Sequence, residues 1–177
     1  RIPKTKELSR EESLAKLSLK YFSSHGPAQI KDFAWWSGLS MKDAAEGLDM
    51  NKFALTQETI DGKTYWFSSQ TRATISNSLT AYLLSIFDEY TISYKDRSAL
   101  SEQRDIERMI SMGNALLSVI ILDGKVVGSW KRVLKKNLVE ITLSPFRELT
   151  KKEKTAVEEA AEKYGKFLEM KPEVTLL

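Results

Sequence analysis

Apolar positions in the first part of the chain recur at helical spacing between clear start and stop signals. A Ser-x-x-Glu capping box at 9–12 predicts the start of a helix, and the Gly-Pro pair at 26–27 predicts its end. Two further helices are predicted over 28–36 and 41–48, the last after the capping residue Ser40. The pattern therefore indicates three consecutive helices.

Two apolar runs, 53–59 and 64–67, follow these helices and flank an Asp-Gly pair at 61–62. This pair is a strong signal for a tight hairpin turn. Three helices followed by a two-stranded wing are the order of a winged helix, in which the third helix would read DNA. We expect a winged-helix domain over residues 1–68.

Polar residues dominate the next stretch, and we expect a connector over 69–82. The remaining chain, 83–177, predicts a β-rich subdomain. A short exposed helix is expected within 99–112, and strands are expected over 116–122, 125–133 and 138–143.

A second capping box, at 150–153, predicts a final helix with a narrow apolar stripe that packs on this sheet. No helical pattern is present from Glu169 onward. The expected class is α+β, a winged helix followed by a small β-meander subdomain with a packed C-terminal helix.

The chemically densest stretch lies at 83–98. Its apolar residues at 84–87 predict a buried strand, which Asp88 and Glu89 interrupt. Ionised carboxylates beside apolar residues are costly unless they are paired, and the run 95–97 supplies two cations that a turn could bring close. This favours an internal salt-bridge knot, with a functional site as the alternative.

Composition narrows the possible chemistry. The 177 residues include no cysteine and one histidine, so we expect no disulfide, no metal and no cofactor. The longest apolar runs are too short for a membrane helix, which leads us to expect a cytoplasmic protein without a membrane partner. Because the sequence starts at Arg1, we expect a natural chain that extends upstream.

The net charge of +3 is mild, so a nucleic-acid role must rest on local charge. The supposed reading helix carries Lys42 as its only cation against three acids, Asp43, Glu46 and Asp49, which argues against reading by this helix. Lys63 in the wing could still contact a phosphate.

A more promising basic cluster surrounds the expected turn after Trp130, and its four cations are Lys131, Arg132, Lys135 and Lys136. Such a turn could bind phosphates while the aromatic ring stacks on or wedges between bases. The alternative is a solvated turn with Trp130 in the core.

Five segments in this order resemble a known family: His25-Gly-Pro-Ala, Asp32-Phe-Ala-Trp-Trp-Ser-Gly-Leu39, Phe87-Asp-Glu-Tyr90, Tyr94-Lys-Asp-Arg-Ser98 and Asp123-Gly-Lys-Val-Val-Gly128 with Trp130. They are similar to the bacterial winged-helix family of AlkZ and YcaQ DNA glycosylases. The resemblance covers about residues 14–167 and corresponds to the C-terminal half of the family.

The resemblance implies tandem winged helices that enclose a basic channel for alkylated or crosslinked DNA, of which this chain would hold the third and the β-rich portion. The family's catalytic signature, glutamine, an apolar residue, then glutamine or aspartate, belongs to the N-terminal part. Gln103-Arg104-Asp105 matches it in letters only. We therefore assign no catalytic residue to this chain.

Our leading hypothesis is a C-terminal region that contributes DNA backbone contacts and pocket wall, with Asp88, Glu89 and Arg97 in supporting positions. Alone it should be inert, and a full-length parent could be a glycosylase acting with the N-terminal winged-helix domains on damaged or distorted duplex DNA. The alternative is a protein-interaction or transcription-regulator-like winged-helix module without catalytic activity.

Overall fold

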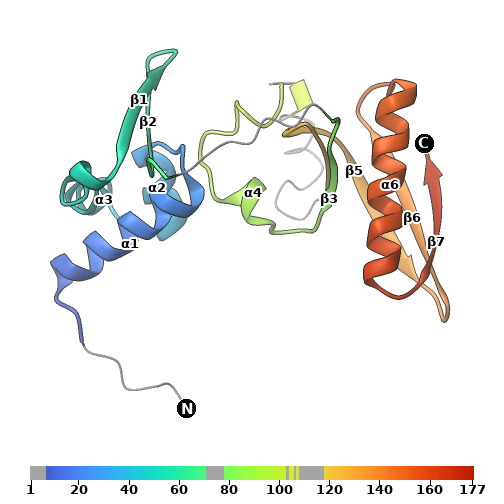
Figure 1. Cartoon of the computed structure of the whole chain (residues 1–177), viewed down its shortest axis with the longest axis horizontal. Helices are drawn as coiled ribbons and strands as arrows, with labels where there is room; N and C mark the ends of the chain where they lie inside the picture. The colour runs from blue at the N-terminus through green and yellow to red at the C-terminus, as the bar shows by residue number, and fades with distance from the viewer. Residues whose placement is uncertain (1–6, 71–77, 103, 106, 108–117) are drawn as a thin grey trace. The chain divides into compact units, whose positions relative to one another are not determined.

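The computed structural model describes residues 7–70, 78–102, 104–105, 107 and 118–177 (Figure 1). By its internal contacts the chain divides into two units. Unit 1 comprises Arg1–Thr74 together with Ser93–Asp96, and unit 2 comprises Ile75–Ile92 and Arg97–Leu177. The predicted division at 1–68, 69–82 and 83–177 stays a prediction.

Three helices open unit 1: α1 (Arg10–His25), α2 (Ile30–Ser37) and α3 (Met41–Asp49). The predicted capping box starts α1, since the Ser9 hydroxyl accepts from the Glu12 amide at 3.1 Å and the Glu12 carboxylate accepts from the Ser9 amide at 2.8 Å. Apolar faces of the helices meet in one core that includes Tyr21, Phe22, Phe33, Ala44 and Leu48.

A hairpin follows the helices after the short 3-10 turn Lys52–Ala54. Its strands are β1 (Thr56–Ile60) and β2 (Lys63–Phe67), which pair antiparallel around Asp61 and Gly62. Both turn residues have positive φ, 51° and 73°, which is the conformation that favours an Asp-Gly pair. Two backbone hydrogen bonds between Ala28 and Trp66, 2.8 and 3.1 Å long, attach the hairpin to the helices.

Unit 2 contains a five-stranded sheet in the order β3-β4-β5-β6-β7. Its elements are β3 (Ala81–Leu84), the one-turn helix α4 (Glu89–Ile92), β4 (Val119–Leu122), β5 (Lys125–Leu134), β6 (Leu138–Pro145), α6 (Lys151–Phe167) and β7 (Lys171–Leu176). Neighbouring strands are antiparallel except β6 and β7, which are parallel. The fold is mixed α+β, as the sequence predicted.

The predicted meander corresponds to β4, β5 and β6, and the predicted box at Thr150 and Glu153 caps α6. The sheet is larger than predicted because β7 joins it after α6. The run Lys171–Leu176 alternates exposed with partly buried residues, the period of a strand with one covered face.

Both faces of the sheet carry apolar residues. On one face, α6 packs through Val157 and Ala161 against a core that includes Ile120, Ile141 and Leu143. On the other, a smaller cluster groups Val119, Ile121 and Val126 with the partly buried Leu84, Leu100 and Phe146. A register shift between Ile120 and Ile121 marks a bulge in the pairing of β4 with β5.

The buried strand expected through 84–87 ends early. β3 stops at Leu84, and Ile86 and Phe87 are 45% and 55% exposed. Phe87 has a φ of 58°, so the backbone turns at this residue and cannot continue an extended strand.

Much of the helix expected within 99–112 falls outside the residues that the structure describes. Within the described ranges, no helix is long and apolar enough to cross a membrane.

Candidate nucleic-acid interface

Unit 1 contains a salt-bridge knot around Asp96, whereas the predicted pairing of Asp88 and Glu89 with the cations of 95–97 stays a prediction. One oxygen of this carboxylate accepts from Lys63 Nζ at 2.9 Å, from Lys31 Nζ at 3.1 Å and from Gln29 Nε2 at 3.2 Å. The hydrogen bond to Asp96 raises the pKa of Lys63. Lys63, expected to face a phosphate, is therefore already engaged with an acid of unit 1.

Asp32 is buried next to this knot, with a residue exposure of 2%. Its Oδ2 accepts from the Gln29 amide at 2.9 Å, and its Oδ1 accepts from the amides of Lys95 and Asp96 at 3.0 and 3.1 Å. Three donors compensate the carboxylate for the loss of water. Asp32 thus holds the segment 93–96 against the start of α2.

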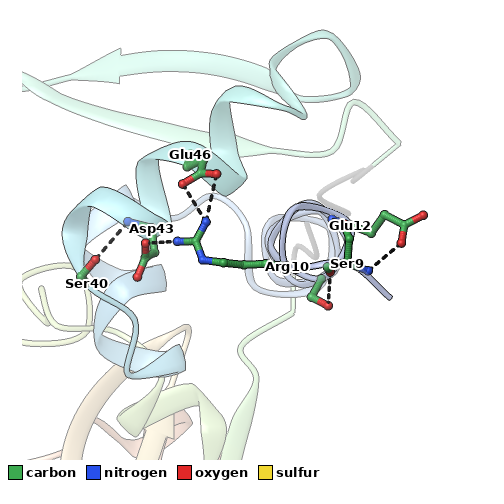
Figure 2. A network of polar contacts seen from close by, with 7 residues as sticks. Ser9, Arg10, Glu12, Ser40, Asp43 and Glu46 are labelled. Atoms are coloured by element: carbon green, nitrogen blue, oxygen red, sulfur yellow. Dashed lines mark hydrogen bonds and ion pairs between the residues drawn. The ribbon is translucent and has the colours of Figure 1, made fainter. Parts of the chain in front are cut away.

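The acids of α3 are bound by a cation from α1 (Figure 2). The Arg10 guanidinium donates to both Glu46 oxygens at 3.1 and 3.2 Å and also to Asp43. Asp49 pairs with Lys52 at 2.6 Å. These ion pairs offset the negative charge of the acids on α3. They do not give the helix a cationic surface, and the exposed cation that belongs to α3 is Lys42.

Asp88 and Glu89 lie at the start of α4, after the end of β3. Asp88 Oδ1 accepts from the Tyr90 amide at 3.0 Å, and the Asp88 carbonyl accepts from the amides of Thr91 and Ile92. Tyr90 donates its hydroxyl to the Gly124 carbonyl at 2.9 Å, so α4 is fixed to the turn between β4 and β5.

Arg97 begins the segment that follows Asp96, and burial lowers the pKa of its guanidinium. The supporting role predicted for Asp88, Glu89 and Arg97 stays a prediction.

Trp130 belongs to the core. It is 5% exposed, its indole Nε1 donates to the Leu84 carbonyl at 2.8 Å, and its ring meets Tyr164 edge-on at 5.1 Å. The alternative of a core tryptophan is therefore correct, and this ring cannot stack on a base at the surface.

The four cations after Trp130 lie on two faces of the β5–β6 hairpin. Strand alternation puts Lys131 on the face away from α6, whereas the Arg132 guanidinium lies 5.4 Å from the Tyr164 ring centre on the α6 side. Lys135 forms an ion pair with Glu140. Every residue from 131 to 137 is nevertheless exposed, so the hairpin end presents its charge to solvent.

Unit 2 also has a cavity of about 460 Å³ that the sequence did not indicate. Its lining includes Ser98, Ser101, Arg104, Lys125, Phe146 and Arg147. Arg147 extends its guanidinium to Glu153, with bonds of 2.7 and 3.1 Å. Charges of both signs line the cavity, because Glu102 and Asp105 also contribute.

The structure also shows an exposed aromatic residue that the sequence pattern did not indicate. Phe167, the last residue of α6, is 81% exposed. It lies two turns after the buried Ala160, at nearly the same position around α6, so helical periodicity predicts burial and does not indicate its exposure.

Comparison with known proteins places these features in a family context. A family model described as DNA glycosylase AlkZ-like matches residues 1–167. The solved structure of the Streptomyces sahachiroi DNA glycosylase AlkZ is similar, with a TM-score of 0.79 and 21% sequence identity, over 98% of this chain and 48% of that chain. This likeness shows a shared fold, and the chain spans about half the length of that protein. No curated protein matches.

Proposed function

The chain belongs to the AlkZ-like DNA glycosylase family, and from this premise we propose that it is the C-terminal region of a DNA-repair protein. Its role is to hold DNA and to form part of the pocket wall. The observation that carries the proposal is the exposed hairpin end at 131–137, where four of seven residues are cations.

In this proposal Lys131, Arg132, Lys135 and Lys136 contact phosphates. Because backbone contacts displace condensed counterions, they supply affinity without reading sequence. The partner is duplex DNA, damaged or distorted, that the full-length protein binds together with its N-terminal winged-helix domains. The exposed charge of the hairpin supports this assignment, and the burial of Trp130 limits it to phosphate contacts.

We assign α1, α2, α3 and the β1–β2 hairpin to a winged helix that acts as scaffold. Support comes from the acids of α3, since Asp43 and Glu46 bind Arg10 and would repel phosphates if that cation were removed. Lys42 and Lys63 contribute at most peripheral contacts, because Lys63 is bound to Asp96.

In this proposal the full-length protein uses the general mechanism of DNA glycosylases. The damaged base is flipped out of the helix and its glycosidic bond breaks through an oxocarbenium-like transition state. Asp88, Glu89 and Arg97 support the wall of the base pocket, and the catalytic groups come from outside this chain.

Charge reversal tests the phosphate assignment. Replacing Lys131, Arg132, Lys135 and Lys136 by glutamate should weaken duplex binding more than about tenfold and reduce the salt slope by about two to four. Fluorescence anisotropy over a range of salt concentrations measures both quantities.

A matched control reverses four exposed lysines elsewhere, Lys16, Lys151, Lys152 and Lys154, for the same change in net charge. A hairpin variant that binds as tightly as the wild type would remove these cations from the interface. Equal losses in the two variants would show an effect of net charge alone.

The second candidate is a protein-interaction or transcription-regulator-like module without catalytic activity. The acidic α3 favours it, together with three exposed apolar residues nearby in sequence, Met41, Met50 and Phe53. Such a module should show no salt-dependent binding to duplex, gapped or abasic DNA, so the same anisotropy series distinguishes the two functions.

A further inference from the structure

The end of α6 presents an aromatic ring to solvent beside the cationic hairpin. Phe167 is 81% exposed, although most phenylalanines of a folded domain are buried. One turn earlier, Tyr164 packs against Trp130 and lies under Arg132, which fixes the last turns of α6 beside β5. The ring of Phe167 is thus held at a defined place without being part of the core.

Helical geometry sets the direction of Phe167. At 100° per residue, Phe167 and Lys163 share one flank of α6, about 160° from Gly165. Gly165 faces β7, because a Cβ there would come within 2.8 Å of Pro172. Phe167 therefore lies on the flank away from β7, while Glu162 is on the flank of Gly165.

The hairpin contributes to the same side of the sheet. Leu134 is two residues beyond Arg132 on the same face of β5, and it is 54% exposed. On the opposite face, Glu140 and Glu173 are direct partners in the pairing of β6 with β7. The two faces consequently differ, since the acids of the strands lie on the face away from α6.

We propose that Arg132, Leu134, Lys163 and Phe167, which we call the α6-side surface, bind an unpaired base of DNA. The Phe167 ring stacks on the base, Leu134 extends the apolar contact, and the two cations bind the adjoining phosphates. Stacking on an aromatic ring beside cations is the physical basis of single-strand binding and accepts any base. The inference rests on the proposed function and names its substrate as DNA with unstacked bases.

Phe167→Ala tests the stacking contact in the 177-residue chain. We expect affinity for a single-stranded or gapped oligonucleotide to fall about five- to a hundredfold, the range for one aromatic stacking residue. Affinity for an intact duplex should change less than about twofold, because paired bases offer no free face at this surface. The matched control is Phe53→Ala, which removes the fully exposed phenylalanine of unit 1.

Rescue by Phe167→Trp separates stacking from loss of structure, since a larger ring should retain or increase binding to the single strand. Circular dichroism melting curves of all three variants check that the fold is kept.

If Phe167→Ala binds single strands as tightly as Phe53→Ala does, the inference is wrong. The exposed Phe167 ring would then be assigned to a contact with a protein. In that case a normal salt-dependent affinity for duplex DNA would leave the proposed function intact. A chain that binds no DNA in any form overturns both proposals.

Discussion

Asp32 shows how one buried carboxylate can position a segment 63 residues further along the chain. Each of its oxygens accepts at least one backbone amide, and two of these amides belong to Lys95 and Asp96. An amide that loses such an acceptor inside a protein is left without compensation for its lost water.

Asp32→Ala should therefore lower the free energy of unfolding by about 2 kcal/mol, since it leaves one buried and two part-buried amides without their charged acceptor. Urea denaturation followed by circular dichroism measures this change. Asp49→Ala, at a carboxylate that is 61% exposed, is the control and should stay within about 0.5 kcal/mol of the wild type. Equal midpoints for the two variants would mean that the Asp32 bonds add no stability.

The sequence could identify only part of this role. The spacing of Gln29 and Asp32 is that of a cap at a helix start, which local reasoning can find. The bonds to Lys95 and Asp96 depend on tertiary structure, and no spacing predicts them. For the same reason, the sequence predicts a phosphate contact for Lys63, whereas the structure shows an ion pair of Lys63 with Asp96.

At the scale of elements, the start of α6 combines a cap with an ion pair. The Glu153 carboxylate accepts from the Thr150 amide at 2.7 Å and from the Arg147 guanidinium. The hydrogen bond from Arg147, with that from the Thr150 backbone, lowers the pKa of Glu153 from 4.5 to about 2. The folded state therefore holds this carboxylate in its charged form more strongly than the unfolded state does.

The sign of the pH effect follows from this depressed pKa. The stabilisation is fully present above pH 4.5 and is lost as the pH falls from 4.5 towards 2. Glu153→Gln should be less stable than the wild type at pH 7, and the difference should shrink as the pH approaches 2. Urea midpoints between pH 2 and pH 7 test this. A constant difference across that range would exclude the titration of Glu153 as its cause.

Elements with local signals could be predicted well. Capping boxes located α1 and α6, and the Asp-Gly pair at 61–62 located the β1–β2 hairpin, because these signals act within a few residues. β7 was missed because a parallel edge strand needs α6 as its crossover, and neither part reveals the pairing alone. The end of β3 was misplaced since the positive φ of Phe87 is unusual for an aromatic residue.

At the scale of the whole molecule, we expect DNA binding and base excision to belong to different parts of the protein. We expect the 177-residue chain to bind DNA without releasing alkylated bases, because we place the catalytic groups outside it. The measurement is chromatography of free bases after incubation with methylated DNA, with a full-length family member as the positive control. Base release above the buffer blank would locate catalytic groups in this chain.

The sequence could predict the α+β class and the family at this scale, because the motif set is spread over most of the chain. It could not predict that Ser93–Asp96 returns to unit 1 between two segments of unit 2. That return depends on Asp32 and on lysines of α2 and β2, which are distant in sequence.

β7 is an edge strand of the sheet, and this position has a consequence for aggregation. An outermost strand can offer its open backbone groups to a second molecule and so seed aggregation. Here the strand begins Lys171-Pro172-Glu173, so two opposite charges flank a residue that has no amide hydrogen to donate. These three residues therefore disfavour intermolecular strand pairing along that margin.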